Sequence, residues 1–323
     1  MLHQRALSLL FAAAMTCAAA PFAGAQTYPS QPIKIVVPTA PGGVADIVGR
    51  SFAQKLNEAG KTAVVENKTG AGGAIAADFV AKSPPDGYTI YVGFHATNAI
   101  LPHLQKLNYN PETDLLPVTI AAKTANVLVV NPSVPAKSMK ELIAYAKANP
   151  GKLTFASQGN GSTGHNVGEQ FKSAAGIDIN HVPYRGAAPA AQDLIAGHVT
   201  MLFDVLTTAV PQIKSDKVRA IAIADAKRAK SLPEVPTVAE AGLPELESGP
   251  WFGFFVPAGT PKPVIDWLYA EAKKAFNSPE VQAQFEKQGL TAMLGTPEQT
   301  RAFVAGEYKR WGDVIKKANI TLN

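Results

Sequence analysis

The sequence predicts an α/β protein built from two domains. The chain has 323 residues, of which 46% are hydrophobic and 17% charged, so it can bury a large core. Because one domain takes roughly 100 to 200 residues, this length favours two domains. Short β-branched runs alternate with longer helical stretches, which is typical of α/β architecture with parallel strands.

The predicted strands are short runs that are mostly apolar on both faces, as buried parallel strands must be. They lie at residues 33–37, 64–65, 89–94, 127–130, 153–156, 199–203, 218–224 and 252–256. Between them, start and stop residues delimit helices. Ser138 precedes a helix over 139–148 that Asn149-Pro150-Gly151 ends, Pro261 opens one over 264–276, and Thr296-Pro297-Glu298 opens the last, to about residue 317.

Two segments are predicted to cross between the domains. One is residues 121–131, and the other is the proline-rich stretch that ends at Pro250 and Trp251. If the chain leaves the first domain near 126 and returns near 250, domain 1 comprises residues 26–126 and 250–323, and domain 2 comprises residues 127–249. The crossings then form a hinge. A single large sheet is the alternative.

Residues 1–25 have the pattern of a secretory signal peptide. Arg5 precedes the apolar run 6–20, and Ala23-Gly24-Ala25 matches a signal-peptidase site, so we expect cleavage after Ala25. A retained anchoring helix is the alternative, although the run is short for a membrane span. The only cysteine, Cys17, lies in this segment, so the mature chain has no thiol for catalysis, zinc binding or disulfides.

The charge pattern argues against nucleic acid as a partner. Lys and Arg total 30 against 25 Asp and Glu, a net charge of +5, and these charges are scattered. Binding along a phosphate backbone requires a clustered basic stripe.

Three predicted strand-to-helix junctions are rich in glycine. They are Pro38 to Gly43, Asn67 to Gly73, and Ser157 to Gly164. Each places backbone N–H groups at a helix N-terminus, where the macrodipole is positive and anions bind. Such turns also occur without a ligand, but three at the carboxyl ends of strands predict an anion site, and we favour a carboxylate.

Signals for cofactors, metals and catalysis are weak. Gly159, Gly161 and Gly164 formally match a dinucleotide fingerprint, but Asp178 precedes the strand expected at 180–182, so we expect no cofactor. There is no GxxxxGK[ST], GxSxG or HExxH motif. No histidine pair has metal-ligand spacing, so no metal is expected, and Ser162 with His165 is the only nucleophile–base pair close in sequence.

The motifs taken together resemble those of the Bug (TctC-like) extracytoplasmic solute receptors over nearly the whole mature chain. The segments that carry the resemblance are Val36 to Gly43 with Asp46 and Arg50, Val65 to Gly73, Ser83 to Thr89, Glu141 to Lys152, Val182 to Ala190, Leu232 to Gly242, and Trp251 to Pro261. The resemblance implies a two-domain periplasmic "Venus flytrap" of type II-like α/β fold, with a hinge between two mixed, mostly parallel sheets. It also implies a monomer without catalytic residues. Such a receptor captures a small organic carboxylate and presents it to the membrane subunits of a tripartite tricarboxylate-type transporter.

The resemblance also implies a set of ligand-binding residues. Those of domain 1 are Thr39, Ala40, Pro41, Gly42, Gly43, Asn67, Gly70, Ala71, Gly72, His95, Thr97 and Asn98. Those of domain 2 are Ser157, Gly161, Ser162, Thr163, His165 and Asp204.

Two departures from the family pattern leave the ligand open. Thr39 stands where many members have Phe, and His95 could add a donor or, below its ordinary pKa of about 6.5, a positive charge. Asp204 either faces the cleft or caps the helix after Thr207. Dicarboxylates, tricarboxylates, acidic amino acids and aromatic acids all remain candidates. A receptor that signals to a membrane sensor is the alternative function.

Overall fold

The computed structural model describes residues 28–184 and 186–322. The predicted signal peptide and its cleavage site lie outside the described residues. The chain divides into two units, Met1–Gln31 and Pro32–Asn323, and the second unit contains every strand and helix discussed below. In the described part of the chain, no helix is both long and apolar enough to cross a membrane.

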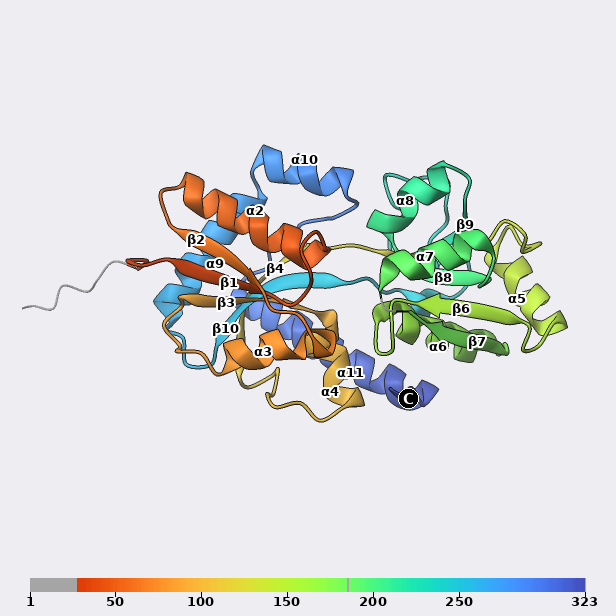
Figure 1. The fold of residues 1–323 in the computed structure, drawn as a ribbon, viewed down its shortest axis with the longest axis horizontal. Helices are drawn as coiled ribbons and strands as arrows, with labels where there is room; N and C mark the ends of the chain where they lie inside the picture. Colours follow the sequence, from red (N-terminus) through yellow and green to blue (C-terminus); the bar gives the residue numbers. More distant parts are fainter. Residues whose placement is uncertain (1–27, 185, 323) are drawn as a thin grey trace, which may run out of the picture. The chain divides into compact units, whose positions relative to one another are not determined.

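The first five-stranded sheet has the order β2-β1-β3-β10-β4 (Figure 1). Its strands are β1 (Ile33–Val37), β2 (Ala63–Asn67), β3 (Thr89–Phe94), β4 (Leu115–Lys123) and β10 (Trp251–Pro257). The β2, β1 and β3 strands pair in parallel, whereas β10 runs antiparallel to both β3 and β4. Its helices are α2 (Val44–Glu58), α3 (Ala74–Ala81), α4 (Leu101–Leu104), α9 (Lys262–Phe276), α10 (Pro279–Lys287) and α11 (Pro297–Ala318), with the short turns η1 (Ala71–Gly73) and η2 (Ala96–Ile100). We call this sheet with its helices the first lobe.

The second sheet has the order β7-β6-β8-β5-β9. Its strands are β5 (Asn126–Val130), β6 (Leu153–Ser157), β7 (Ile179–Pro183), β8 (Met201–Val205) and β9 (Arg219–Ala224). Here β5 is the antiparallel strand, paired with β8 and β9. The helices of this second lobe are α5 (Met139–Ala148), α6 (Thr163–Ala175), α7 (Ala187–Ala196) and α8 (Leu206–Lys214), and the turn η3 (Pro244–Leu246) lies on the returning segment.

The two mixed sheets confirm the predicted α/β fold class and show that a single large sheet is wrong. Within the predicted crossing at 121–131, β4 of the first sheet continues to Lys123 and β5 of the second sheet begins at Asn126. The sequence analysis missed β4 altogether. The chain returns to the first sheet at Trp251. The proposed domain boundaries at 126/127 and 249/250 stay a prediction.

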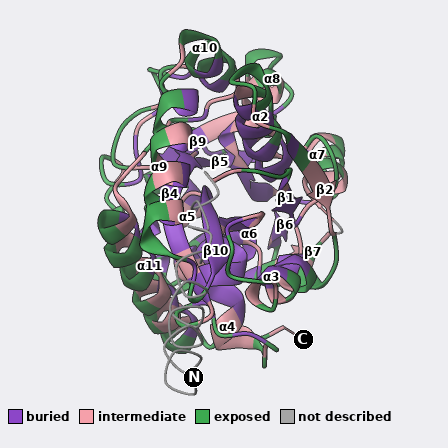
Figure 2. Ribbon diagram, turned by 90° about the vertical axis from the view of Figure 1, so that its left-hand side faces the viewer, coloured by how far each residue is buried: buried purple, intermediate pink, exposed green. Residues whose placement is uncertain are grey.

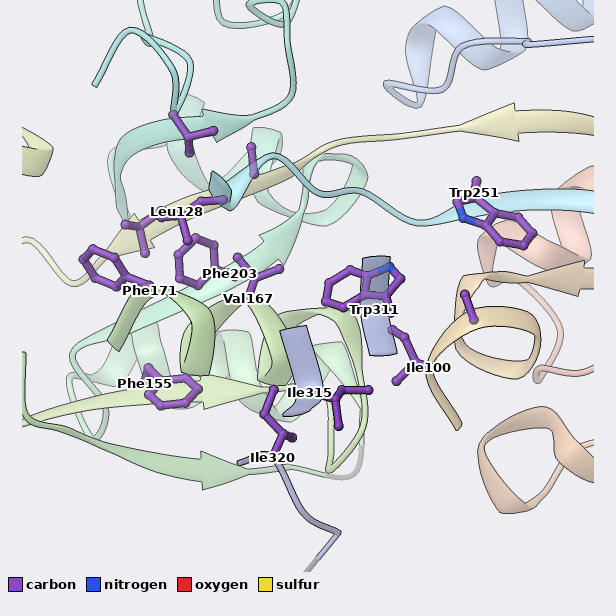
Figure 3. Packing of buried hydrophobic residues seen from close by; sticks show 14 of the residues in the cluster. Ile100, Leu128, Phe155, Val167, Phe171, Phe203, Trp251, Trp311, Ile315 and Ile320 are labelled. Atoms are coloured by element: carbon purple, nitrogen blue, oxygen red, sulfur yellow. The ribbon is translucent and has the colours of Figure 1, made fainter. Parts of the chain in front are cut away.

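The core continues from one sheet to the other. The central strands of both sheets are buried, the edge strands β2 and β7 are partly exposed, and the helices carry much of the exposed surface (Figure 2). One buried cluster includes Trp251 of β10 and Phe155 of β6, and α11 adds Trp311 and Ile315 to it (Figure 3). Because α11 contacts both β4 and α6, it connects the lobes in addition to the chain crossings.

Candidate ligand-binding cavity

A cavity of about 440 Å³ lies where carboxyl ends of strands from both sheets meet. This volume is within the range of small-molecule sites. The first lobe lines it with Pro38, Thr39, Val44, Ala45, Gly70, Gly72, Gly73, Phe94, His95, Ala96, Leu101 and Phe252, and the second lobe with Gln158, Asn160, Gly161, Ser162, Thr163 and Val205; Pro250 lies on the returning segment. The helices α2, α3 and α6 all begin at this lining.

Asp46 holds the first glycine turn in shape. Its carboxylate accepts the N–H of Gly42 at 2.9 Å, the Arg50 guanidinium at 2.8 Å and the Asn67 amide at 2.9 Å. Burial raises the pKa of Asp46, but these hydrogen bonds outweigh burial and hold it below its usual value. Asn67 also donates to the backbone oxygen of Thr39 at 2.9 Å. Asn67 therefore positions this turn from outside the cavity lining.

The second glycine turn, Gly70 to Gly73, requires its glycines. Gly70, Gly72 and Gly73 have φ of 124°, 64° and 97°, values that other residues rarely adopt. A Cβ on Gly73 would come within 2.8 Å of the Phe94 ring. Neither α2 nor α3 has a side-chain cap at its N-terminus. Both helix starts therefore present uncapped N-terminal turns beside the cavity.

His95 connects the two lobes at the cavity. Its Nε2 is hydrogen-bonded to the Thr163 hydroxyl, which belongs to α6 of the second lobe. The side chain is 7% exposed, and burial together with the charge of Arg310 lowers its pKa to about 3. Of the two alternatives, the lowered pKa therefore favours a neutral His95 that donates a hydrogen bond over one with a positive charge. Its Nδ1 is buried with no hydrogen-bond partner among the described residues, as is the hydroxyl of Thr39.

The third glycine turn is hydrogen-bonded within the second lobe. Ser162 caps α6 by accepting the backbone N–H of His165 at 3.3 Å, and the His165 Nδ1 accepts the N–H of Gly161 at 3.1 Å. The His165 ring stacks on His181, with centroids 4.1 Å apart, and burial lowers the pKa of His165 to about 4. Ser162 and His165 therefore meet through the backbone, without the hydroxyl–imidazole hydrogen bond of a nucleophile–base pair.

Asp204 is buried within the second lobe, outside the lining of the cavity. Successive residues of a strand face opposite sides, and it is the next residue, Val205, that lines the cavity. Asp204 is 2% exposed and accepts the N–H of Val205 at 2.8 Å. Burial raises its pKa to about 6, against hydrogen bonds from Thr208, Val205 and Gln158 that lower it.

The structure brings together part of the predicted set. Thr39, Gly70, Gly72, His95, Gly161, Ser162 and Thr163 line the cavity. Ala40, Pro41, Gly42, Gly43, Asn67, Ala71, Thr97, Asn98, Ser157, His165 and Asp204 lie outside its lining. Thr97, for example, is buried in the first lobe, where its hydroxyl meets the Tyr91 hydroxyl at 2.8 Å. Contact of any of these residues with a ligand stays a prediction.

Sequence reasoning missed the apolar wall of the cavity. Phe94 and Phe252 stack with ring centroids 6.2 Å apart and planes inclined by 6°, and Leu101 lies in the same lining. Their only signal was position, since Phe94 ends one predicted strand and Phe252 begins another. No described residue that lines the cavity carries a Lys, Arg, Asp or Glu side chain. The described part of the chain also contains no group of three potential metal-binding side chains.

Two lobes around a cavity whose described lining has no charged side chain, with three helices that begin at this lining, are typical of two-lobed solute-binding proteins. The family model described as "Tripartite tricarboxylate transporter family receptor" matches residues 47–320, and the chain belongs to this family. It is 38% identical over 301 residues to protein BugT of Bordetella pertussis, covering 92% of each chain.

Two solved structures of similar proteins contain carboxylates. The structure titled R. palustris Rpa4515 with adipate has a TM-score of 0.82 at 35% identity, covering 91% of this chain and 99% of that one. MatC (Rpa3494) from Rhodopseudomonas palustris with bound malate has a TM-score of 0.77 at 34% identity, covering 89% and 100%. The family and the fold class predicted from the sequence are thus confirmed.

Proposed function

We propose that this receptor binds a small organic carboxylate in the 440 Å³ cavity and delivers it to the membrane subunits of a tripartite tricarboxylate-type transporter. The observation that carries the proposal is that the N-termini of α2, α3 and α6 meet at a cavity in whose lining no described residue has a charged side chain. Backbone amides and helix dipoles then supply the attraction for the anion. The adipate and malate bound by two relatives support the same ligand class.

In this proposal the carboxylate binds to the first lobe, and closure of the lobes completes the site. The Thr39 hydroxyl and the His95 Nδ1 are unpartnered and buried, so each can donate to a carboxylate oxygen. Donation from Nδ1 requires the neutral tautomer in which Nε2 accepts the hydrogen bond of Thr163. Ligand binding and the contact between the lobes thereby favour the same state.

The proposed cycle contains no bond-breaking step. Ser162 and His165, the pair that a hydrolase would need, are each hydrogen-bonded to backbone groups of the second lobe. We accordingly propose a receptor that works without catalysis, in the periplasm, after removal of residues 1–25. Its monomeric state belongs to the same proposal.

The test is a thermal-shift and calorimetry panel on ligand-stripped protein. Adipate, malate, citrate and benzoate are each compared with the corresponding uncharged amide. A ligand at a hundred times its Kd stabilises the protein by about 2.7 kcal/mol, which moves the Tm visibly. We expect at least one acid to shift the Tm while its amide does not. The absence of a shift with every acid, or equal shifts with acid and amide, would contradict carboxylate binding.

A pair of variants locates the site. Thr39→Val removes the unpartnered hydroxyl at nearly constant volume, and we expect about tenfold weaker binding. Thr62→Val is the matched control, since Thr62 lies outside the cavity lining. Equal affinities in the two variants would show that the ligand binds elsewhere.

A further inference from the structure

The polar groups of the cavity are distributed unequally between the lobes. In the first lobe the Thr39 hydroxyl and His95 Nδ1 are buried without partners. In the second lobe, three polar side chains of the lining already have partners. Gln158 donates to the Phe203 carbonyl at 3.0 Å, Ser162 accepts from the His165 N–H at 3.3 Å, and Thr163 bonds to His95.

The helix N-termini show the same inequality. The α2 and α3 helices have no side-chain cap, whereas α6 is capped by Ser162. The N–H of Gly161 is also taken, by His165 Nδ1. A carboxylate at the first lobe therefore meets the unpartnered Thr39 hydroxyl and His95 Nδ1, whereas a second carboxylate at the start of α6 would have to displace hydrogen bonds that the protein already makes.

Apart from the exposed side chain of Asn160, the remaining side chains of the lining are apolar. The stacked rings of Phe94 and Phe252, with Leu101 and Val205, surround the space between the two polar ends. Transfer of a charged group from water to such a surface is strongly unfavourable without a partner, whereas an apolar ligand body gains from the same burial. The buried Asp204 carboxylate, next to Val205 in sequence and hydrogen-bonded to Gln158 of the lining, adds repulsion for a second anion once it is ionised, above its pKa of about 6.

We propose that the cavity is selective for a monocarboxylate with an apolar body, such as an aromatic or aliphatic acid, over a dicarboxylate of the same length. This inference rests on the proposed function, since it assumes that the ligand carboxylate binds in this cavity. The ligand preference proposed here differs from the ligand in the structure of a relative, which contains adipate, a dicarboxylate.

The decisive comparison is hexanoate against adipate, which share a six-carbon chain and differ in one carboxylate. Calorimetry on ligand-stripped protein at pH 7.5, with benzoate as an aromatic probe, should show hexanoate or benzoate binding at least about tenfold more tightly than adipate. Adipate binding as tightly as both, or more tightly, would overturn this inference and leave the proposed function intact. If none of the three acids and no acid of the wider panel binds, both fail together.

A charge placed in the second lobe tests where the selectivity arises. Val205 is half-buried in the lining, so Val205→Lys provides a cation for a second carboxylate. We expect the hexanoate-to-adipate affinity ratio to fall about tenfold in this variant. Ser215→Lys adds the same charge at the exposed end of α8, outside the lining, and should keep the wild-type ratio. An unchanged ratio in Val205→Lys, or an equal fall in both variants, would contradict the inference.

Discussion

The turn from Gly70 to Gly73 and the turn from Gln158 to Ser162 have similar positions but different contacts. Both follow a parallel strand, contain glycines with positive φ and precede a helix that begins at the cavity. The first leads into α3 without a side-chain cap, whereas Ser162 caps the helix that follows the second. The two turns therefore differ in side-chain capping, and in our proposal the helix start without a side-chain cap is the one that binds the carboxylate.

The two lobes also differ in the surroundings of their buried acids, Asp46 in the first lobe and Asp204 in the second. Asp46 is hydrogen-bonded to Arg50, Gly42 and Asn67, which keep its pKa low despite burial. Asp204 has no cation among the groups that act on it, and burial raises its pKa to about 6. The first lobe therefore pairs its acid with a cation close to the proposed carboxylate site, whereas the acid of the second lobe has no such cation among the groups that act on it.

The largest effect is expected from Gly73→Ala in the uncapped turn. The new Cβ would lie 2.8 Å from the Phe94 ring and 2.9 Å from the Thr97 methyl, at a φ of +97°. Strain and overpacking together predict a loss of about 2–5 kcal/mol in the free energy of unfolding, and weaker carboxylate binding. Urea unfolding measures the first quantity and calorimetry the second.

Gly60→Ala is the control for this change. Gly60 has a φ of +72°, but a Cβ there meets nothing within 4 Å. Its loss should be only about 1 kcal/mol, from backbone strain alone, with binding unchanged. Equal losses at the two positions would show that the crowded turn has no special requirement for glycine.

The next largest effect concerns the pH dependence of Asp204. Because its pKa is raised from 3.8 to about 6 on folding, the native state binds the extra proton between these values. The contribution of Asp204 to the free energy of unfolding is therefore greatest below pH 4. It falls by about 3 kcal/mol as the pH rises through 6. In Asp204→Asn this loss is absent, so the stability difference between variant and wild type should shift by that amount between pH 4 and pH 8.

Asp46→Asn is the contrasting variant for this experiment. The pKa of Asp46 is lowered on folding, so its contribution is present above its unfolded pKa and lost as the pH falls through the folded value. The two variants should therefore change the pH profile in opposite directions. Parallel profiles would contradict the difference in electrostatic environment between the lobes.

A smaller effect is expected from Thr163→Val, which removes the hydrogen bond between the lobes. The buried Nε2 of His95 is left without its partner, and we expect a loss of about 2 kcal/mol in the free energy of unfolding. Thr163→Ser keeps the hydroxyl and should regain most of this stability and of the carboxylate affinity. If the two variants bind with equal affinity, the contact has no part in ligand binding.

Local patterns in the sequence predicted much of the fold. The runs at 33–37 and 89–94 match β1 and β3 because each is continuous and bounded by turn residues. The strand β4 was missed, since Pro117 interrupts its apolar run and its end was taken for a crossing. The antiparallel direction of β10 was not predictable either, because it depends on where the chain returns after the second lobe.

In the site too, features that depend on neighbouring residues were predictable, and contacts between distant parts of the chain were not. The glycine turns were predictable because backbone conformation and helix starts depend on neighbouring residues. The stacking of Phe94 on Phe252 joins residues from distant parts of the chain. The lowered pKa of His95 likewise results from burial between the lobes, so the sequence alone could not decide between a neutral donor and a positive charge.

The smallest effect, and the most direct test of the comparison, is Ser162→Ala. Loss of this cap should lower the free energy of unfolding by about 1 kcal/mol and release the N–H of His165. Ser138→Ala is a matched control, because Ser138 caps α5 by accepting the Glu141 N–H at 3.2 Å, outside the cavity lining. Both variants should lose similar stability, but only Ser162→Ala should strengthen adipate binding relative to hexanoate, because the start of α6 then resembles that of α3. An unchanged ratio in Ser162→Ala would mean that the cap does not exclude a second carboxylate, and the difference between the two turns would then be one of structure alone.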